Sequence, residues 1–287
     1  MPKGIYACIV FAAGACYGVL STFVKIAYAA GLDLTDVSGV QCLFGMFFLW
    51  AGVFFTRKKT LTPFHVLSLL AVGIPMALTT IFYYRSLETL SASLAVVFLF
   101  QSIWMGSVVE AFISHRFPSP LKCLSIILCL AGTFLAAGFL EGDQPLSLSS
   151  GMVWGLLAAL SYTAVITASS LLGEGVPPAL KGALMATGDT ILTCIVLPPV
   201  FILTPAIWPA LLPFGLLLGL FGVALPPFLL SWGMPHIGPG LGSILVASEL
   251  PVALVMALLV LGESAAPLQW AGIACILGGI VVGNVSK

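Results

Sequence analysis

Glu249 is the side chain in this sequence most suited to chemistry inside a membrane, because it is a carboxylate in the middle of a long apolar run. A charge in hydrocarbon costs about 3 kcal/mol or more unless it faces protein or water, so such a residue is a functional candidate. Gly242 lies two helical turns earlier on the same predicted helical face, and Pro251 removes a backbone donor shortly afterwards. Two interpretations stay open: Glu249 binds a proton or an amine, or it is a protonated group that links helices.

Asp189 and Lys25 are two further charges within apolar runs. Both lie on helical stripes of small and polar residues, one made of Gly182, Ala186, Asp189 and Thr193, the other of Gly14, Gly18, Ser21 and Lys25. Such a face inside a membrane must be covered by another helix or by water. Asp189 is therefore either a helix-packing residue or a ligand for an ion or a substrate. Lys25 either lines the mouth of a cavity or extends to the membrane interface.

Aromatic rings and one amide predict what kind of molecule a cavity in this protein would hold. The candidate lining residues are Tyr17, Tyr83, Gln101, Trp104 and Tyr162. Rings bind apolar bodies by stacking and cations by cation–π contact, and the amide of Gln101 needs a polar partner in hydrocarbon. The alternative for the rings is ordinary packing or a belt at the membrane interface.

Prolines interrupt several of the apolar runs. Pro75 and the pair Pro226 and Pro227 stand at roughly corresponding places, and Pro251 follows Glu249. A proline inside a helix removes a backbone hydrogen bond and bends the helix. Paired interruptions are typical of helices beside a binding site in membrane proteins built from repeats. We expect these prolines to act as hinges.

The elements that carry these residues are membrane spans. The 287 residues are 60% hydrophobic and 7% charged, whereas a soluble domain carries roughly 25% charge. The apolar runs 37–56, 89–109, 123–140 and 264–286 are each near the roughly 20 residues that span hydrocarbon as a helix. They are continuously apolar, and barrel strands would alternate. The predicted fold is therefore an all-α polytopic membrane protein.

Charges, prolines and glycines divide the chain into ten expected transmembrane helices. These cover residues 4–28, 36–56, 65–86, 90–112, 121–140, 151–173, 179–203, 210–232, 239–261 and 267–286. Basic residues then gather at one end of the helices, and acidic residues gather at the other. Because basic loops stay inside the cell, we predict that both termini are cytoplasmic.

The two halves of the sequence are similar to each other. The similarity lies in Pro-Leu motifs followed by small residues, at 120–122 and 131–132 and again at 267–269 and 278–279, and in the segments 12–17 and 157–162. Five spans per half place the second half in the opposite orientation. We predict one transmembrane domain over residues 1–287, made of two inverted five-helix repeats, residues 1–140 and 151–287.

Residue types that would indicate other chemistry do not cluster in the sequence. The seven cysteines are odd in number and lie inside apolar runs without Cys-x-x-Cys spacing. The histidines at 65, 115 and 236 are scattered. We expect no metal site, no cofactor, no catalytic residue and no nucleic-acid partner.

The last forty residues or so of the sequence resemble a known family. The resemblance lies in four motifs, Glu249-Leu250-Pro251-Val252, Leu261-Gly262-Glu263, Gln269-Trp270-Ala271-Gly272 and Leu277-Gly278-Gly279. Their order and spacing are those of the ninth and tenth helices of EamA-like exporters in the drug/metabolite transporter superfamily. The first half departs from the pattern, because Ser114-His115-Arg116 stands where a Gly-Glu is expected. The resemblance implies an exporter of amino acids, related metabolites or xenobiotics in the inner (plasma) membrane, with a central cavity between the halves.

The predicted function is secondary transport by alternating access, in which a small amphipathic metabolite such as an amino acid is exported. The predicted partners are this solute and the lipid bilayer, with protons as a candidate coupling ion, and Gly279-x-x-x-Gly283 allows a homodimer as well as a monomer. One alternative, an intramembrane enzyme, would need a nucleophile or metal constellation that the sequence lacks. The other, a passive channel or lipid-handling protein, is disfavoured by the inverted duplication.

Overall fold

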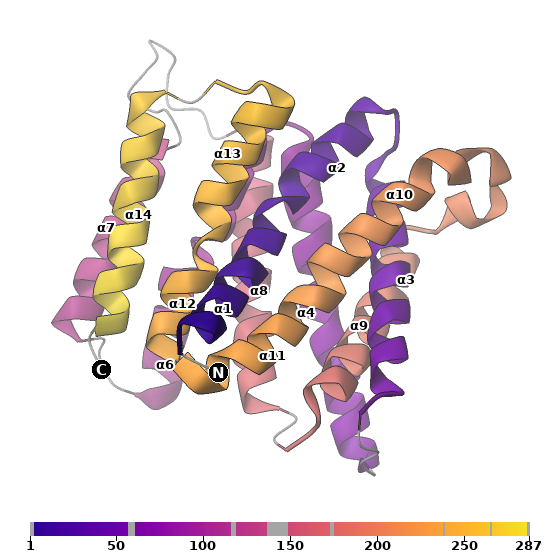
Figure 1. Ribbon diagram of the computed structural model, residues 1–287, viewed down its shortest axis with the longest axis horizontal. Helices are drawn as coiled ribbons and strands as arrows, with labels where there is room; N and C mark the ends of the chain where they lie inside the picture. Colours follow the sequence, from indigo (N-terminus) through magenta and orange to yellow (C-terminus); the bar gives the residue numbers. More distant parts are fainter. Residues whose placement is uncertain are drawn as a thin grey trace.

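The computed structural model of the protein describes residues 3–56, 61–115, 119–136, 149–172, 175–237, 239–264 and 266–285, and within these ranges the regular structure is entirely helical (Figure 1). Eight of the helical stretches are long and apolar enough to cross a membrane, and two shorter apolar helices, Pro120–Ala136 and Pro267–Gly283, stand at the places of the fifth and tenth predicted spans. The predicted class, an all-α polytopic membrane protein, is confirmed.

The first half of the chain supplies five spans from seven helices. These are α1 (Lys3–Gly18) with α2 (Leu20–Ala29), α3 (Leu34–Val53), α4 (Pro63–Leu87), α5 (Ala92–Leu99) with α6 (Ser102–Ser114), and α7 (Pro120–Ala136). Side-chain caps begin several of them: Asp33 and Asp36 cap the start of α3 reciprocally, and Thr62 and Ser91 accept from the first turns of α4 and α5.

The second half repeats this order. Its elements are α8 (Ser150–Leu171), α9 (Pro178–Val196), the short turns η1 (Val200–Leu203) and η2 (Pro205–Ile207), α10 (Trp208–Leu218) joined through the π-helical turn η3 (Gly219–Ala224) to α11 (Leu225–Ile237), α12 (Pro239–Val246) with α13 (Glu249–Leu261), and α14 (Pro267–Val285). The start of α1 and the end of α14 lie at the same end of the bundle, the lower one in Figure 1. We call it the terminal end, and we call the opposite end, where α2 and α13 finish, the distal end.

Helices of the two halves exchange partners reciprocally. In the first half α4 packs against α8 and α9, and in the second half the corresponding span, α10 to α11, packs against α1 and α3. Likewise α5 and α6 pack against α8, while α12 and α13 pack against α1. The last spans of the two halves, α7 and α14, pack against each other. Reciprocal pairing of this kind is what a pseudo-two-fold relation between the halves produces.

The contact between α7 and α14 shows the same reciprocity at single residues. Ser125 Oγ donates a hydrogen bond of 2.6 Å to the Gly279 carbonyl, and the backbone of Gly132 approaches that of Gly272 so closely that a Cβ on either would overlap the other's carbonyl. Ser125 and Gly272 are equivalent in the repeats, as are Gly132 and Gly279, because each pair is 147 residues apart. The glycine motif that ends the chain is therefore used inside the bundle.

The spans predicted as continuous helices over 90–112 and 239–261 are both broken. In the fourth span the break falls between α5 and α6, and in the ninth it falls between α12 and α13. The half-helices α5 and α12 have 8 residues each, α6 and α13 have 13 each, and the members of each pair are 147 residues apart. His115 and Gly262, also 147 residues apart, end α6 and α13 in the left-handed region with φ of 51° and 65°. The expectation that Gly242 and Glu249 share one helical face is wrong, because the break separates them.

Candidate functional site

Glu249 is the first residue of α13 and stands directly after the break in the ninth span. At the break the Leu250 amide bonds the Ala247 carbonyl, and the Val252 amide bonds the Ser248 carbonyl, each at 3.1 Å. The Glu249 side chain is 9% exposed, so its carboxyl group is held inside the protein at the start of a half-helix, where the helix dipole favours negative charge. Pro251 lies in the first turn of α13, where a missing N–H breaks no bond inside the helix.

Three predicted tyrosines gather around Glu249. Tyr17 of α1, Tyr83 of α4 and Tyr162 of α8 all lie close enough for their phenol groups to interact electrostatically with the Glu249 carboxyl, and Tyr17 also interacts with Tyr162. The four side chains come from the first, third, sixth and ninth spans. We call them the Glu249 cluster. It combines three rings, their hydroxyls and one acidic group between the two halves of the chain.

Helix α1 packs directly on the break that carries Glu249. A Cβ at Gly18 would lie 2.7 Å from the Glu249 carbonyl oxygen, and one at Gly14 would overlap Ser248 and the Val246 carbonyl. The Ser248 hydroxyl donates to the Phe11 carbonyl at 3.0 Å. Gly14 and Gly18 therefore allow α1 to approach the broken segment closely, and this packing holds Tyr17 beside Glu249.

Two buried hydroxyls follow Tyr17 in the first span: Ser21, which belongs to the predicted stripe with Lys25, and Thr22, which was not predicted. Ser21 and Thr22, in the first turn of α2, are fully buried, and among the described residues neither Ser21 Oγ nor Thr22 Oγ1 has a partner that meets hydrogen-bond geometry. Ser21 lies near the hydroxyl of Tyr83. Buried hydroxyls are nearly always bonded to protein or water, so a polar group of a ligand would find unused donors and acceptors here.

Gln101 and Trp104 form a separate pair that faces α7. The Gln101 side chain is 2% exposed; its amide nitrogen donates to the Val97 carbonyl at 3.1 Å and to the Thr133 hydroxyl, and its oxygen accepts from the Trp104 indole nitrogen at 2.9 Å. The partners that the amide requires are thus supplied by the protein. These contacts join the break in the fourth span to the fifth span, and none of them involves Glu249.

Asp189 lies in a third polar group, where α9 crosses α3 and α4. Its side chain is 2% exposed and accepts a hydrogen bond of 3.2 Å from Thr193 Oγ1. Electrostatic interactions reach Cys42 of α3 and Tyr84 of α4, and the Tyr84 hydroxyl donates to the Gln41 amide oxygen. The polar stripe on α9 is therefore covered by helices. Tyr84 follows Tyr83 of the Glu249 cluster, with ring centroids 5.9 Å apart.

Lys25 lies near the distal end, where it interacts electrostatically with Glu263. Glu263 stands just after α13 and reaches across to α5: its Oε1 accepts from the Ala92 amide at 2.9 Å, and its Oε2 accepts from the Ser93 hydroxyl at 3.4 Å. Lys25 is thus near the end of the predicted pathway, and its partner is a residue that the sequence marked only as part of a family motif.

The predicted hinge prolines occupy three kinds of position. Pro75 lies inside the continuous helix α4, and its carbonyl accepts from Thr79 Oγ1 at 2.7 Å. Pro226 and Pro227 lie in the first turn of α11, directly after the wide π-helical turn η3. That turn makes room for the pyrrolidine rings, which would clash with carbonyls one turn earlier in a regular helix. Pro251, as described above, belongs to the start of α13.

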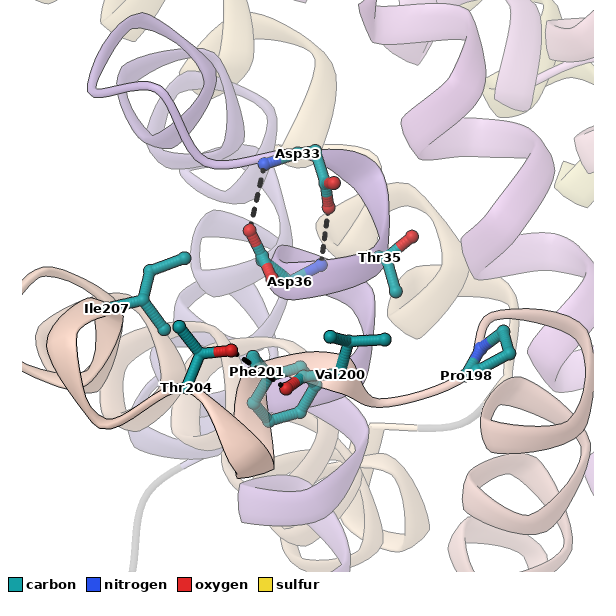
Figure 2. A pocket seen from close by; sticks show the side chains of 8 residues that line it. All are labelled: Asp33, Thr35, Asp36, Pro198, Val200, Phe201, Thr204 and Ile207. Carbon is teal, nitrogen blue, oxygen red and sulfur yellow. Dashed lines mark hydrogen bonds between the residues drawn. The ribbon is translucent and has the colours of Figure 1, made fainter.

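A pocket of about 400 Å³ opens elsewhere, at the distal end between the start of α3 and the turns η1 and η2 (Figure 2). Its acidic residues, Asp33 and Asp36, bond each other's backbone amides at 2.8 and 3.3 Å, so they serve the helix cap. None of the predicted site residues lines this pocket. Within the described ranges, no three His, Cys, Asp or Glu side chains come together as a metal site requires.

Comparisons with known proteins agree with this architecture. A family model described as the EamA-like transporter family matches residues 4–138 and 149–285. The uncharacterized transporter YxxF of Bacillus subtilis (strain 168) is 28% identical over 142 residues, which is 48% of this chain and 44% of that protein. The aligned region thus spans less than half of the relative. One solved crystal structure superposes with a TM-score of 0.68 at 18% identity over 98% of this chain and 99% of that chain, a likeness of fold alone.

Proposed function

We propose that this chain, which belongs to the EamA-like transporter family, is a secondary transporter that exports a small amphipathic metabolite by alternating access. The observation that carries this proposal is the Glu249 cluster, which brings three rings and one carboxyl group together at a break in a transmembrane helix. Irregular backbone at membrane depth is tolerated only inside protein or along a cavity, and in transporters it marks the binding site.

The chemistry of the cluster supports a substrate with an apolar body and one cationic or polar group. Tyrosine rings stack on flat apolar groups and attract cations, and the Glu249 carboxylate would pair with an amine. The unpartnered hydroxyls of Ser21 and Thr22 would bond a further polar group. An amino acid or a compound of similar size fits these three requirements. A polyphosphate or other multivalent anion would face the carboxylate and find no basic partner among the members of this cluster.

The matched breaks in the fourth and ninth spans support alternating access. Each break divides a span into two short helices that can tilt separately, and the two breaks are equivalent in the repeats. Two halves of one design in opposite orientations have two mirror-related arrangements of nearly equal energy, one open to each side. Glu249 and the tyrosines lie between the halves, so a solute bound there would be exposed to either side in turn.

The distribution of charge supports an orientation with both termini in the cytoplasm of the inner (plasma) membrane. At the terminal end the described helices carry Lys3, Lys122 and Lys181. At the distal end the acidic residues Asp33, Asp36, Glu88 and Glu263 outnumber the basic residues Lys25 and Arg85. Lysine and arginine are retained on the cytoplasmic side. In this orientation the distal end opens to the outside, and transport of a cytoplasmic metabolite runs from the terminal end to the distal end.

A comparison of metabolites between cells that overproduce the protein and cells that lack it tests the proposal most broadly. Overproducing cells should accumulate at least one amino acid or related amine in the medium and should resist a toxic analogue or a cationic dye of the same class. Cells with Glu249→Gln at the same level in the membrane should do neither. Unchanged media and unchanged sensitivity across the whole panel would contradict an export function.

A further inference from the structure

Glu263 makes a contact with α5 at the distal end of the bundle, just after α13. The first amide groups of a helix have no partner within it. In α5 the Ser91 hydroxyl accepts from the Leu94 amide at 3.2 Å and lies 3.3 Å from the Ser93 hydroxyl. Glu263 bonds the free Ala92 amide at 2.9 Å and the Ser93 hydroxyl at 3.4 Å. A carboxylate is well suited to this place because a helix begins with partial positive charge. The cap therefore comes from a residue 171 positions away in the sequence.

The two helices joined in this way are the distal halves of the two broken spans. Distal half-helix α5 packs directly against distal half-helix α13, and both pack against α2. On the other side of the breaks, α6 packs against α7 and α8, whereas α12 packs against α1, α11 and α14. The broken spans thus meet at the distal end, and their terminal halves are held by other helices. The Glu249 cluster lies on the terminal side of this meeting point, at the start of α13.

Lys25 brings a third helix to the same point. It lies on α2, the distal continuation of the helix that carries Tyr17, and it interacts electrostatically with Glu263. One carboxylate therefore connects the distal ends of the first, fourth and ninth spans. The position equivalent to Glu263 in the first half, 147 residues earlier, is Arg116. Arginine has no acceptor atom, so the two repeats differ in residue type at this position, which in the first half lies outside the described residues.

From this arrangement we propose that Glu263 is a distal gate latch: its bonds to Ala92 and Ser93 hold the outer end of the pathway shut, and their release opens it. The inference rests on the proposed alternating access and adds the element that sets which end is closed at rest. It also gives Lys25 a role, because its electrostatic interaction with Glu263 ties α2 to the same point as α5 and α13.

The test measures access to the pathway and requires no substrate. Ser21 is fully buried, and along the first span it lies one helical turn after Tyr17 and one turn before Lys25, so Ser21→Cys is a reporter for opening at the distal end. In the otherwise native protein, a membrane-impermeant maleimide is added from the distal side, and modification of this one position is followed by peptide mass spectrometry. Glu263→Ala in this background should raise the modification rate about tenfold, the effect of losing one charge-assisted hydrogen bond.

Matched variants distinguish a latch from general loosening. Glu88→Ala removes another carboxylate at the same end, one whose ion pair is local, with Arg85 three residues earlier at 3.7 Å, and the modification rate should stay at the parental value. Glu263→Gln keeps an acceptor for the Ala92 amide but loses the charge, so its rate should lie between those of the parent and Glu263→Ala. If Glu263→Ala reaches the membrane in lower amounts, the modification rate of Glu263→Gln is compared with that of the parent instead.

Three results would overturn the latch. The first is a parental modification rate in both Glu263 variants. The second is an equal rise in Glu88→Ala. The third is a rise that is the same when the reagent is applied from the terminal side, because a lost gate opens one end only. Any of these results can occur while export is intact, and export of every tested solute can be absent while the modification rates change as expected. The experiment therefore distinguishes failure of the latch from failure of the proposed export function.

Discussion

At the scale of single residues, the polar side chains inside the spans differ in how many of their hydrogen bonds the protein itself supplies. Gln101 uses both amide hydrogens and its oxygen within the protein, and Asp189 receives a hydrogen bond from its own helix. The groups that interact with Glu249 are the phenols of three tyrosines, and one of these, Tyr83, lies near the buried Ser21 hydroxyl. A group that protein contacts already satisfy stabilises the fold, whereas unused bonding capacity in the interior is available to a ligand.

Glu249→Gln tests whether the carboxyl group serves transport. The amide keeps the shape and the hydrogen-bonding capacity but cannot carry a charge, so the variant should reach the membrane at the parental level and lose transport of cationic substrates. In the parent, transport of a cation should weaken as pH falls, because a protonated carboxyl no longer pairs with it; in the variant this dependence should be absent. Export measured between pH 5 and 8 decides, with Glu88→Gln as the control. Parental activity and pH dependence in Glu249→Gln would leave Glu249 a structural link between helices.

Trp104→Phe should act on stability more than on transport. Phenylalanine keeps a ring but removes the N–H that bonds Gln101 Oε1 at 2.9 Å, which leaves a buried carbonyl oxygen unpaired at a cost of about 1 to 3 kcal/mol. The thermal midpoint of the purified protein should fall, while the same change at Trp270, which is 42% exposed, should move it little. An unchanged thermal midpoint together with weaker transport of aromatic substrates would contradict this structural role and would support the predicted role of Trp104 in substrate binding.

At the scale of elements, glycines allow the helices to cross closely, and two crossings hold the halves together. The backbone of Gly188 in α9 lies against the Leu70 carbonyl of α4, and Gly219 in η3 lies against the backbone of Gly45 in α3. These crossings correspond to each other under exchange of the halves. They position the third and eighth spans, which carry Tyr83 and the proline pair after η3.

Gly188→Ala tests the first crossing. An added Cβ would overlap the Leu70 carbonyl oxygen, which is backbone and cannot rotate away, so we expect a loss of about 1 to 3 kcal/mol from overpacking and a lower yield in the membrane. Gly106→Ala in α6 is the matched control, because nothing lies within 4 Å of its added Cβ, and alanine there should be neutral or stabilising by about 0.5 to 1 kcal/mol. Thermal unfolding in detergent compares them. Equal stability of the two variants would contradict the crossing.

At the scale of the whole molecule, the class of fold could be predicted from the sequence because hydrocarbon permits so few solutions. Apolar runs near 20 residues gave the spans, and Glu249 with Tyr17, Tyr83 and Tyr162 could be selected because charges and ring hydroxyls are rare inside such runs. The breaks could not be predicted, since residues 100–101 and 247–248 contain neither proline nor glycine. They depend on tertiary contacts: the Ser248 hydroxyl bonds the Phe11 carbonyl, and the Gln101 amide bonds the Thr133 hydroxyl of α7. Glu263 was missed as a contact because its partners lie in the other half of the chain.

The proposed orientation is tested by reporters fused at Thr60 and Ser147, which lie outside the described residues. With both termini cytoplasmic and five spans in the first half, a reporter after Thr60 should be active inside the cell, and one after Ser147 should be active outside. Alkaline phosphatase and a fluorescent protein give opposite signals on the two sides, which provides an internal control. The same side for both positions would remove the proposed orientation and the inverted repeat together.

Flux through the purified protein in sealed vesicles tests the transport function and its site together. Vesicles are loaded with labelled amino acids and amines, aromatic and aliphatic, and in parallel with a sugar phosphate and a nucleotide. We predict that the parent protein gives saturable release of at least one aromatic amino acid or amine. Glu249→Gln should release it at the rate of loaded vesicles without protein, and the phosphate compounds should not be released. Release of a sugar phosphate or nucleotide while every amine stays inside, or equal release by the parent and Glu249→Gln, would contradict a transporter that binds its substrate at the Glu249 cluster.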